Sequence, residues 1–362
     1  MDRKTSPFRP VTVADVARRA EVSKATAARV LGGYGPVSEE VKLRVQAAAK
    51  ALDYRPNELA RSMSTGKSGT IGIVVGDIEN AFFGIAVRSI SDTAHRHGFN
   101  VILANSGEEV EAEKAALKVL VGKRVDGLIV TPADNRNVAH LRDIVRSRRP
   151  LVLFDRPIEG LAADVVASDD RDAAFAATMR LVEAGHRRLA YVTALNAEPP
   201  VFTGPEQLYT SSVKARIDGF LAACRAAGIE EPECGVCLAG GTVGGQQRAS
   251  VERLLLAAEP PTAILASDSL VAFEIFKVMQ ARGLRIPDEL SLVSFYDAEW
   301  TSVTTPPISV IDQPVYDMGT QAAELLIARI NGDSPPVRHC VLPTRFIERG
   351  SIGAPRRLMA AI

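Results

Sequence analysis

The feature that most constrains the fold is a regular alternation of short apolar runs and amphipathic stretches between residues 70 and 350. Val/Ile/Leu-rich runs of this length are typical of strands buried on both faces, and the stretches between them have helical periodicity. The predicted strands are Ile71–Val75, Val101–Ala104, Gly127–Val130, Leu151–Phe154, Leu189–Thr193, Val236–Leu238, Ala263–Ala266 and Leu292–Phe295. The predicted helices lie near 83–97, 111–123, 171–184, 213–227, 246–258 and 269–282.

Strand-helix alternation of this kind predicts parallel sheets with helices on both faces. Eight or more strands fit two lobes better than one sheet, and residues 305–314 are then a return crossing between the lobes.

The first seventy residues differ from the rest in charge. They hold 13 Lys/Arg against 7 Asp/Glu, while the remaining 292 residues hold 30 against 36, although the whole chain is neutral. A basic module joined to an acidic body is one reading of such a split, and a chance fluctuation of surface charge is the other.

The start of the basic segment has the pattern of two short helices joined by a tight turn. One apolar face is formed by Val13, Val16, Ala17 and Ala20, with Thr12 and Asp15 spaced as in a capping box. Ser23 can cap a second helix that ends at Gly32-Gly33. This arrangement is a helix-turn-helix, and a third helix opening at Ser38 would close its core.

The second helix leaves small residues flanked by two cations on its outer face. Arg29 is the candidate for bidentate contact with a guanine edge, and Lys24 for a base or a phosphate. A helical bundle with no role at DNA is the competing interpretation. After Pro56, the segment 57–64 predicts a fourth short helix capped by Asn57.

The ordered set VTVADVARRAEVSKATAARVLGG and PVSEEVKLRVQAAAKALDYRPNELARSM closely resembles the DNA-binding headpiece of the LacI/GalR family of bacterial regulators. The resemblance covers residues 11–64 and continues along the chain. It implies a small all-α helix-turn-helix DNA-binding domain, followed by an α/β two-lobed domain like type I periplasmic-binding proteins. It assigns the recognition helix in the DNA major groove to Ser23, Lys24, Ala25, Thr26, Ala28 and Arg29.

The same resemblance makes residues 57–64 a hinge helix in the minor groove, with Asn57, Ala60, Arg61 and Met63 as its site residues. Met63 stands where the family usually inserts a leucine between base pairs, so it is either a wedge or part of a core. Ala28 and Gly32 depart from the family's usual Ser and Asn, which predicts an operator half-site that differs from the family's common one.

Polar and aromatic residues follow several predicted strands, and ligands bind beyond the carboxyl ends of strands in open parallel sheets. Carboxylates, an amide, aromatic rings and a guanidinium are the chemistry of a sugar site. Asp268 could equally be a helix N-cap, and Phe82 or Phe83 could be core. The candidate effector-binding residues, six of them also at the family's effector positions, are Asn80, Phe82, Phe83, Asp155, Arg216, Ser267 and Asp297.

Three departures from the family pattern concern this site. Asn80-Ala81-Phe82-Phe83 replaces Asn-Pro-aromatic-Phe, and Asp169-Asp170 replaces Asp-Asn. The segment 196–211, NAEPPVFTGPEQLYTS, is about a dozen residues longer than usual and could form a lid over the cleft.

The predicted organisation is a flexible arm (1–10), a helix-turn-helix domain (11–56), a hinge helix and linker (57–69), an effector-binding and dimerisation domain (70–350) and a tail (351–362). The expected partners are double-stranded operator DNA and a small-molecule effector, a sugar or sugar derivative. A second copy of the chain is also expected, because one helix-turn-helix reads too few base pairs. No membrane partner, metal or cofactor is predicted, and a cytoplasmic, nucleoid-associated protein is expected.

The leading expectation is a dimeric, ligand-controlled repressor, and two other protein classes compete with it. An exported solute-binding protein would lack the headpiece and carry a signal peptide. A sugar-metabolising or NAD-dependent enzyme requires a phosphate-cradling glycine loop, and the sequence contains no such motif. The Cys234-x-x-Cys237 pair has no second pair or histidines for zinc, and His186 is interpreted as a helix-end residue.

Overall fold

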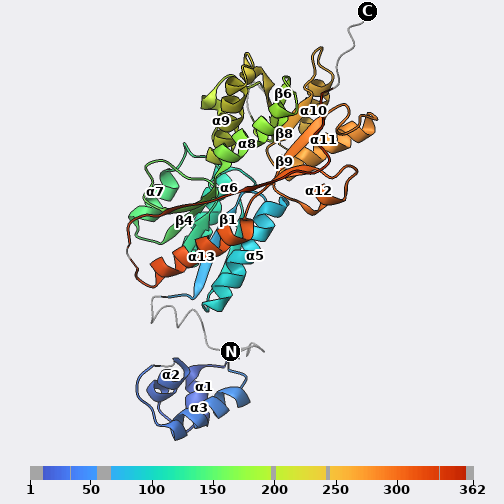
Figure 1. The fold of residues 1–362 in the computed structure, drawn as a ribbon. Helices are drawn as coiled ribbons and strands as arrows, with labels where there is room; N and C mark the ends of the chain where they lie inside the picture. Colours follow the sequence, from blue (N-terminus) through green and yellow to red (C-terminus); the bar gives the residue numbers. More distant parts are fainter. Residues whose placement is uncertain are drawn as a thin grey trace, which may run out of the picture. The chain divides into compact units, whose positions relative to one another are not determined.

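The computed structural model describes residues 11–32, 34–54, 67–196, 201–241, 245–333 and 335–355. The chain divides into two compact units, Met1–Gly69 and Thr70–Ile362. Both are drawn in Figure 1, and each is described by itself below.

The first unit contains α1 (Val13–Arg19), α2 (Lys24–Gly32) and α3 (Glu39–Ala51). Its helices begin where the sequence supplies caps: the Thr12 backbone N–H donates to Asp15 Oδ2 at 3.0 Å, and the Thr26 N–H donates to Ser23 Oγ at 3.0 Å. Small residues form the core, which lets three short helices approach closely. The buried members are Val16, Ala17, Ala20, Ala27, Val45 and Ala48.

The second unit consists of two lobes, each built on a six-stranded sheet. Lobe one has the strand order β11-β5-β4-β3-β1-β2, and all its pairings are parallel. Its strands are β1 (Thr70–Val75), β2 (Asn100–Asn105), β3 (Gly127–Val130), β4 (Leu151–Phe154), β5 (Asp164–Ser168) and β11 (His339–Leu342). Its helices are α5 (Ala81–Arg96), α6 (Val110–Gly122), α7 (Ala139–Arg146) and α13 (Val315–Ile330).

Lobe two has the strand order β12-β10-β9-β8-β6-β7, in which β12 alone runs antiparallel to its neighbour among the described pairings. Its strands are β6 (Leu189–Thr193), β7 (Val236–Leu238), β8 (Ala263–Ala266), β9 (Ser291–Phe295), β10 (Ser309–Asp312) and β12 (Arg345–Ile347). Its helices are α8 (Asp170–Glu183), α9 (Ser211–Ala226), α10 (Gln246–Leu255), α11 (Ser269–Ala281) and α12 (Glu299–Val303), with 3₁₀ turns η1 (Pro205–Gln207) and η2 (Pro232–Gly235).

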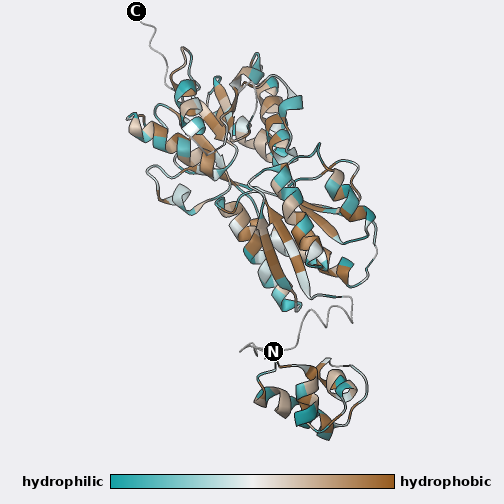
Figure 2. Ribbon diagram, turned by 180° about the vertical axis from the view of Figure 1, so that it is seen from behind, coloured by the Kyte–Doolittle hydropathy of each residue, from teal (hydrophilic) through white to brown (hydrophobic). Residues whose placement is uncertain are grey.

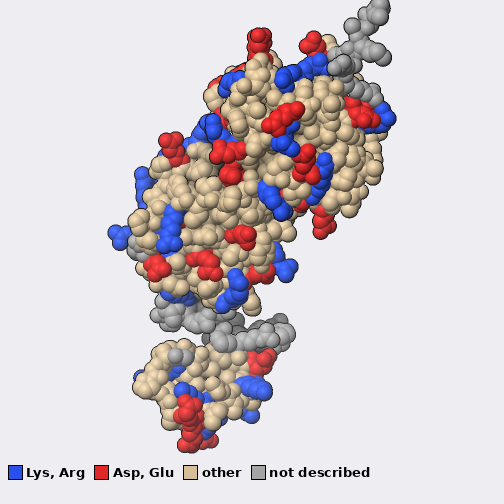
Figure 3. All heavy atoms as spheres, in the orientation of Figure 1, with Lys and Arg blue, Asp and Glu red and all other residues tan. Residues whose placement is uncertain are grey.

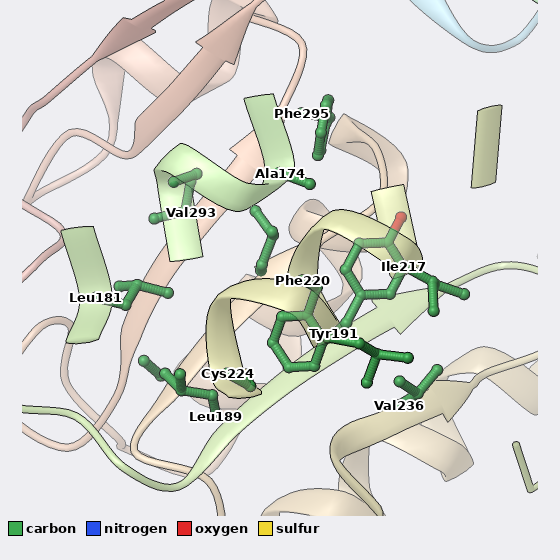
Figure 4. Packing of buried hydrophobic residues seen from close by; sticks show 14 of the residues in the cluster. Ala174, Leu181, Leu189, Tyr191, Ile217, Phe220, Cys224, Val236, Val293 and Phe295 are labelled. Carbon is green, nitrogen blue, oxygen red and sulfur yellow. The ribbon is translucent and has the colours of Figure 1, made fainter. Parts of the chain in front are cut away.

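Each sheet separates two apolar layers, because successive residues of a strand face opposite sides. On β1, Ile71 and Ile73 pack with α5 and α13, whereas Val74 packs with α6 and α7. In lobe two one layer includes α8 and α9 and the other α10 and α11. Figure 2 shows the apolar residues concentrated in the strands and on the helix faces turned toward them. Figure 4 shows the first of these lobe-two layers, where the Tyr191 ring lies 5.9 Å from the Phe220 ring.

The chain passes between the lobes at residues 168–170, 312–315 and 342–345. The segment 305–314, predicted as a return crossing, forms strand β10 of lobe two and leads directly into α13 of lobe one. The two-lobed parallel architecture predicted from the alternation is confirmed. Strands β5, β11 and β12 and helices α7, α12 and α13 were not predicted.

No helix within the described ranges is both long enough and apolar enough to cross a bilayer.

Candidate functional site

The outer face of α2 carries the predicted recognition residues. Lys24, Ala25 and Arg29 are exposed, while Thr26 and Ala28 are half-buried. Ser23, also exposed, holds the start of the helix through Thr26. Among the described residues neither Lys24 nor Arg29 forms an ion pair, so both cations are available to a ligand. The buried residue on the opposite side is Ala27, as the helical periodicity predicted.

The predicted hinge residues Asn57, Ala60, Arg61 and Met63 lie outside the described residues.

A cavity of about 550 Å³ lies between the lobes of the second unit, where the carboxyl ends of strands from both sheets meet. We call it the interlobe cavity. Six of the seven predicted effector residues line it: Asn80, Phe82, Phe83, Asp155, Arg216 and Ser267. Residues chosen because they follow strand ends therefore lie around one cavity.

Asp297 is placed elsewhere. Its Oδ2 accepts from Arg349 Nη2 at 2.7 Å, and its Oδ1 accepts from the Thr301 hydroxyl at 2.8 Å. These bonds connect the loop after β9 to the C-terminal segment, so both oxygens of the carboxylate already have protein partners. The neighbouring Tyr296 lines the cavity instead.

Arg216 is the buried cation of lobe two. Its Nε donates to Asp170 Oδ1 at 2.9 Å, its Nη1 donates to the Ser267 carbonyl at 2.7 Å, and its guanidinium stacks 4.2 Å from the centre of the Phe295 ring. Burial alone would lower the pKa of Arg216. The carboxylates of Asp170 and Asp155 have the larger effect and raise this pKa above its ordinary value, so the guanidinium stays charged. Burial raises the pKa of Asp170 to about 6, against the opposing effect of Arg216.

Ser267 contributes through its backbone as well as its side chain. Its carbonyl holds Arg216, and its hydroxyl donates to Asp268 Oδ2 at 2.8 Å. Asp268 Oδ1 accepts from the N–H groups of Leu270 and Val271 at 2.9 and 3.0 Å, which confirms its reading as a helix N-cap. Asp268 also lines the cavity.

Asp155 and Arg156 form the corresponding charged group of lobe one. Asp155 follows β4 in a left-handed conformation (φ 67°), and its Oδ1 is buried with no hydrogen-bond partner among the described residues. Arg156 donates to Glu108 at 2.5 and 2.9 Å and to the Pro132 carbonyl at 2.9 Å. Burial lowers the pKa of Arg156, but Glu108 more than compensates and raises it.

Aromatic rings line the cavity from both lobes. Phe82 packs edge-on against Phe83 at 5.2 Å and against Tyr296 of lobe two at 6.2 Å. Phe82 and Phe83 are both buried and both line the cavity, so each belongs at once to the core of lobe one and to the site. Asn80 caps α5 by accepting from the Phe82 N–H at 3.0 Å, and this fixes the helix that presents the rings.

The described part of the long segment after β6 contacts both lobes beside the cavity. We call residues 201–210 the strap. Lobe two anchors it, because Phe202 and Leu208 are buried in its core. It contacts lobe one where the Asn135 N–H donates to the Tyr209 carbonyl at 2.7 Å and Arg136 Nη1 donates to the Glu206 carbonyl at 2.8 Å. Tyr209 and Thr210 line the cavity.

Several cavity residues were not predicted from the sequence. Arg156 directly follows Asp155, and Tyr296 directly follows β9, so position after a strand was a usable signal for both. Glu108 and Gln313 reach the cavity from segments whose place depends on the whole fold. No group of three or more His, Cys, Asp and Glu in the described ranges is arranged to hold a metal ion.

Comparison with known proteins gives a consistent result for both units. The profile described as "Bacterial regulatory proteins, lacI family" matches residues 12–57, and that of a "Periplasmic binding protein-like domain" matches 178–352. The ribose operon repressor of Halalkalibacterium halodurans is 32% identical over 93% of this chain and 96% of its own length. Catabolite control protein A of Priestia megaterium is 30% identical over 94% and 99%. The chain belongs to the LacI family.

This LacI-family protein is therefore a DNA-binding transcription regulator with a helix-turn-helix unit and an effector-binding unit. Its fold is also that of a Lac repressor dimer bound to operator and the anti-inducer ONPF, with a TM-score of 0.80 and 24% identity over 96% of this chain and all of that one. The predicted fold class is confirmed.

Proposed function

We propose that this LacI-family regulator is a repressor that binds a palindromic operator as a homodimer and responds to a small, sugar-like effector in the interlobe cavity. The observation that carries the proposal is the cavity itself, where polar groups from both lobes surround one ligand-sized space. The names of the relatives support it, since one is a ribose operon repressor.

DNA recognition is assigned to the exposed face of α2. Small residues such as Ala25 and Ala28 allow the backbone to approach a groove closely, and the unpaired cations Lys24 and Arg29 supply charge for phosphates and base edges. The proposal gives Asn57, Ala60, Arg61 and Met63, outside the described residues, to the minor groove, with Met63 as the wedge.

Dimerisation is assigned to the outer edge of lobe one. Strand β2 is an edge strand, and Leu103 on it is 43% exposed. Ile85 on α5 and Val119 on α6, two helices that pack against β2, are also exposed. An apolar edge of this kind favours burial against a second copy of the chain. Elsewhere, the face of the second unit seen in Figure 3 carries basic and acidic side chains mixed together.

The switch follows from the placement of charges in both lobes. A ligand that touches Asp155 and Arg216 together binds the closed arrangement better than an open one, and that difference in affinity shifts the equilibrium. Lobe one begins at Thr70, directly after the predicted hinge and linker at 57–69, so a movement of lobe one can change the spacing of two hinge segments in a dimer.

Operator selection from a random DNA library tests the proposal directly. We expect a palindromic site, and we expect Arg29→Ala to lose discrimination at one base pair per half-site by about 1–3 kcal/mol. Lys50→Ala, an exposed lysine at the end of α3, is the matched control. Selection of a site without two-fold symmetry would contradict the dimer. Equal weakening of Arg29→Ala on operator and random DNA would show that this side chain contacts phosphate alone.

A further inference from the structure

The interlobe cavity is strongly acidic. Six carboxylates line it, against two guanidiniums: Asp77, Glu79, Glu108, Glu109, Asp155 and Asp268 face Arg156 and Arg216. Asp170 does not line the cavity, but it forms an ion pair with Arg216 and adds a further buried carboxylate close to it. No other Lys or Arg in the described part of the chain lines the cavity. The neighbouring segments 197–200 and 242–244 contain neither residue type in sequence.

Both guanidiniums already have a carboxylate partner. Arg156 is held by two bonds to Glu108, and Arg216 by Asp170. Capture of a phosphate or carboxylate relies on a cation whose donors are free for a fork of hydrogen bonds. Arg156 Nε is buried without a hydrogen-bond partner among the described residues, but it lies 3.8 Å from Asp155 Oδ2. An incoming anion at this guanidinium would therefore meet the carboxylates of Glu108 and Asp155.

Asp155 provides a carboxylate oxygen that can accept a hydrogen bond from a ligand. Its side chain is 4% exposed, and Oδ1 is buried without a hydrogen-bond partner among the described residues. A buried acceptor of this kind is costly unless a partner is supplied. The Thr210 hydroxyl of the strap is in the same condition and also lines the cavity. Hydroxyl groups of a ligand can satisfy both.

We propose that the effector carries no anionic group and donates a hydroxyl hydrogen bond to Asp155 Oδ1. Sugar phosphates, sugar acids and nucleotides are then excluded, and neutral polyols, sugars or nucleosides are accepted. The inference rests on the proposed function and specifies the chemistry of its effector. Like charges a few ångströms apart in a partly buried site repel strongly, so an anionic analogue should bind at least about 100-fold more weakly than its neutral counterpart.

Matched pairs of compounds test this with the full chain. Thermal shift and then calorimetry would compare ribose with ribose 5-phosphate, glucose with glucuronate, and uridine with its 5′-monophosphate, within a wider panel of neutral sugars and their acids. The inference expects every compound that binds to be neutral. An anionic member that binds as tightly as its neutral partner would overturn it.

Substitution of Asp155 supplies the second measurement. Asp155→Asn should weaken the neutral ligand by about 10- to 100-fold, the usual range for a lost charged hydrogen bond, and should narrow its preference over the anionic partner. Asp143→Asn, an exposed carboxylate on α7, is the control and should change neither. An unchanged neutral-to-anionic ratio in Asp155→Asn would refute the inference. A panel with no binder would also count against it, whereas operator selection, run with and without the compounds of the panel, measures DNA binding and tests the repressor function separately.

Discussion

Removal of the Arg216 guanidinium should destabilise the second unit in a pH-dependent way. In Arg216→Met the carboxyl of Asp170 keeps the Ser168 hydroxyl as a partner, at 3.1 Å, and loses its counter-charge. With that charge gone, Asp170 should take up a proton at pH 7.5. The wild-type pKa is about 6. Each pH unit above that value adds about 1.4 kcal/mol, which gives about 2 kcal/mol at pH 7.5.

Two further contacts are lost with Arg216. Its bond to the Ser267 carbonyl and its stacking on Phe295 together contribute about 1–2 kcal/mol. The expected total is about 3–4 kcal/mol, within the range found when one partner of a buried ion pair is removed. For a unit of this size that loss corresponds to a fall in Tm of about 5–7 °C.

Urea unfolding at several pH values measures both parts of this loss. The destabilisation should shrink as the pH is lowered from 7.5 toward 6, because wild-type Asp170 then also becomes protonated. The double variant Arg216→Met/Asp170→Asn lacks both charges of this pair and should recover at least about 2 kcal/mol at pH 7.5. A cost that is independent of pH, or a double variant no more stable than the single one, would refute the argument.

Two other predictions concern the strap and His186. Arg136→Ala removes the bond to the Glu206 carbonyl and the contact with the Tyr209 ring (5.7 Å), so the effector should dissociate roughly 2- to 10-fold faster in stopped-flow measurements, and an unchanged rate would contradict the latching role. Burial lowers the pKa of His186 below 6.5, so its contribution to the free energy of unfolding is fully present above pH 6.5 and is lost as the pH falls below that value. His186→Asn should therefore flatten the dependence of stability on pH below 6.5, and an equal slope in both proteins would show that other groups cause it.

The central strands of both sheets could be predicted because they are buried on both faces and read as apolar runs. Strands β11 and β12 could not, because both lie at sheet edges and neither contains a fully buried residue. The partner of β11 is β5, in which His339 pairs with Val165. A local pattern contains no information on a pairing between segments so far apart in sequence.

The misplacement of Asp297 has a local physical cause. Beyond β9 the chain leaves the extended conformation at Tyr296, whose φ is 68°. A left-handed residue redirects the side chains that follow it, so counting along the strand no longer tells which side chain enters the cavity. Asp155 has the same conformation after β4, with φ 67°, but there the residue at the left-handed position is itself the cavity residue.

The pairing of the charges was also beyond the sequence. The residue types Asp, Arg and Glu could be placed at strand ends, but the choice of Glu108 for Arg156 and of Asp170 for Arg216 depends on side chains that meet only in the folded lobes. Those pairings decide whether the cavity favours or disfavours a negatively charged ligand. If both guanidiniums lacked carboxylate partners, the same residues would form a binding site for an anion.

Two kinds of contact join the lobes at the interlobe cavity, and they have different consequences for control. The strap bonds from Asn135 and Arg136 involve protein groups alone, so they favour closure whether or not an effector is present. Such contacts set the resting balance between open and closed arrangements but cannot report on a ligand. The proposed contacts from an effector to Asp155 and Arg216 would exist only in its complex, and they alone would add a difference in affinity between the two arrangements. Under the proposed mechanism, the strap bonds lower the free energy that an effector must supply to close the lobes. They also narrow the range over which the effector can shift the balance between open and closed arrangements.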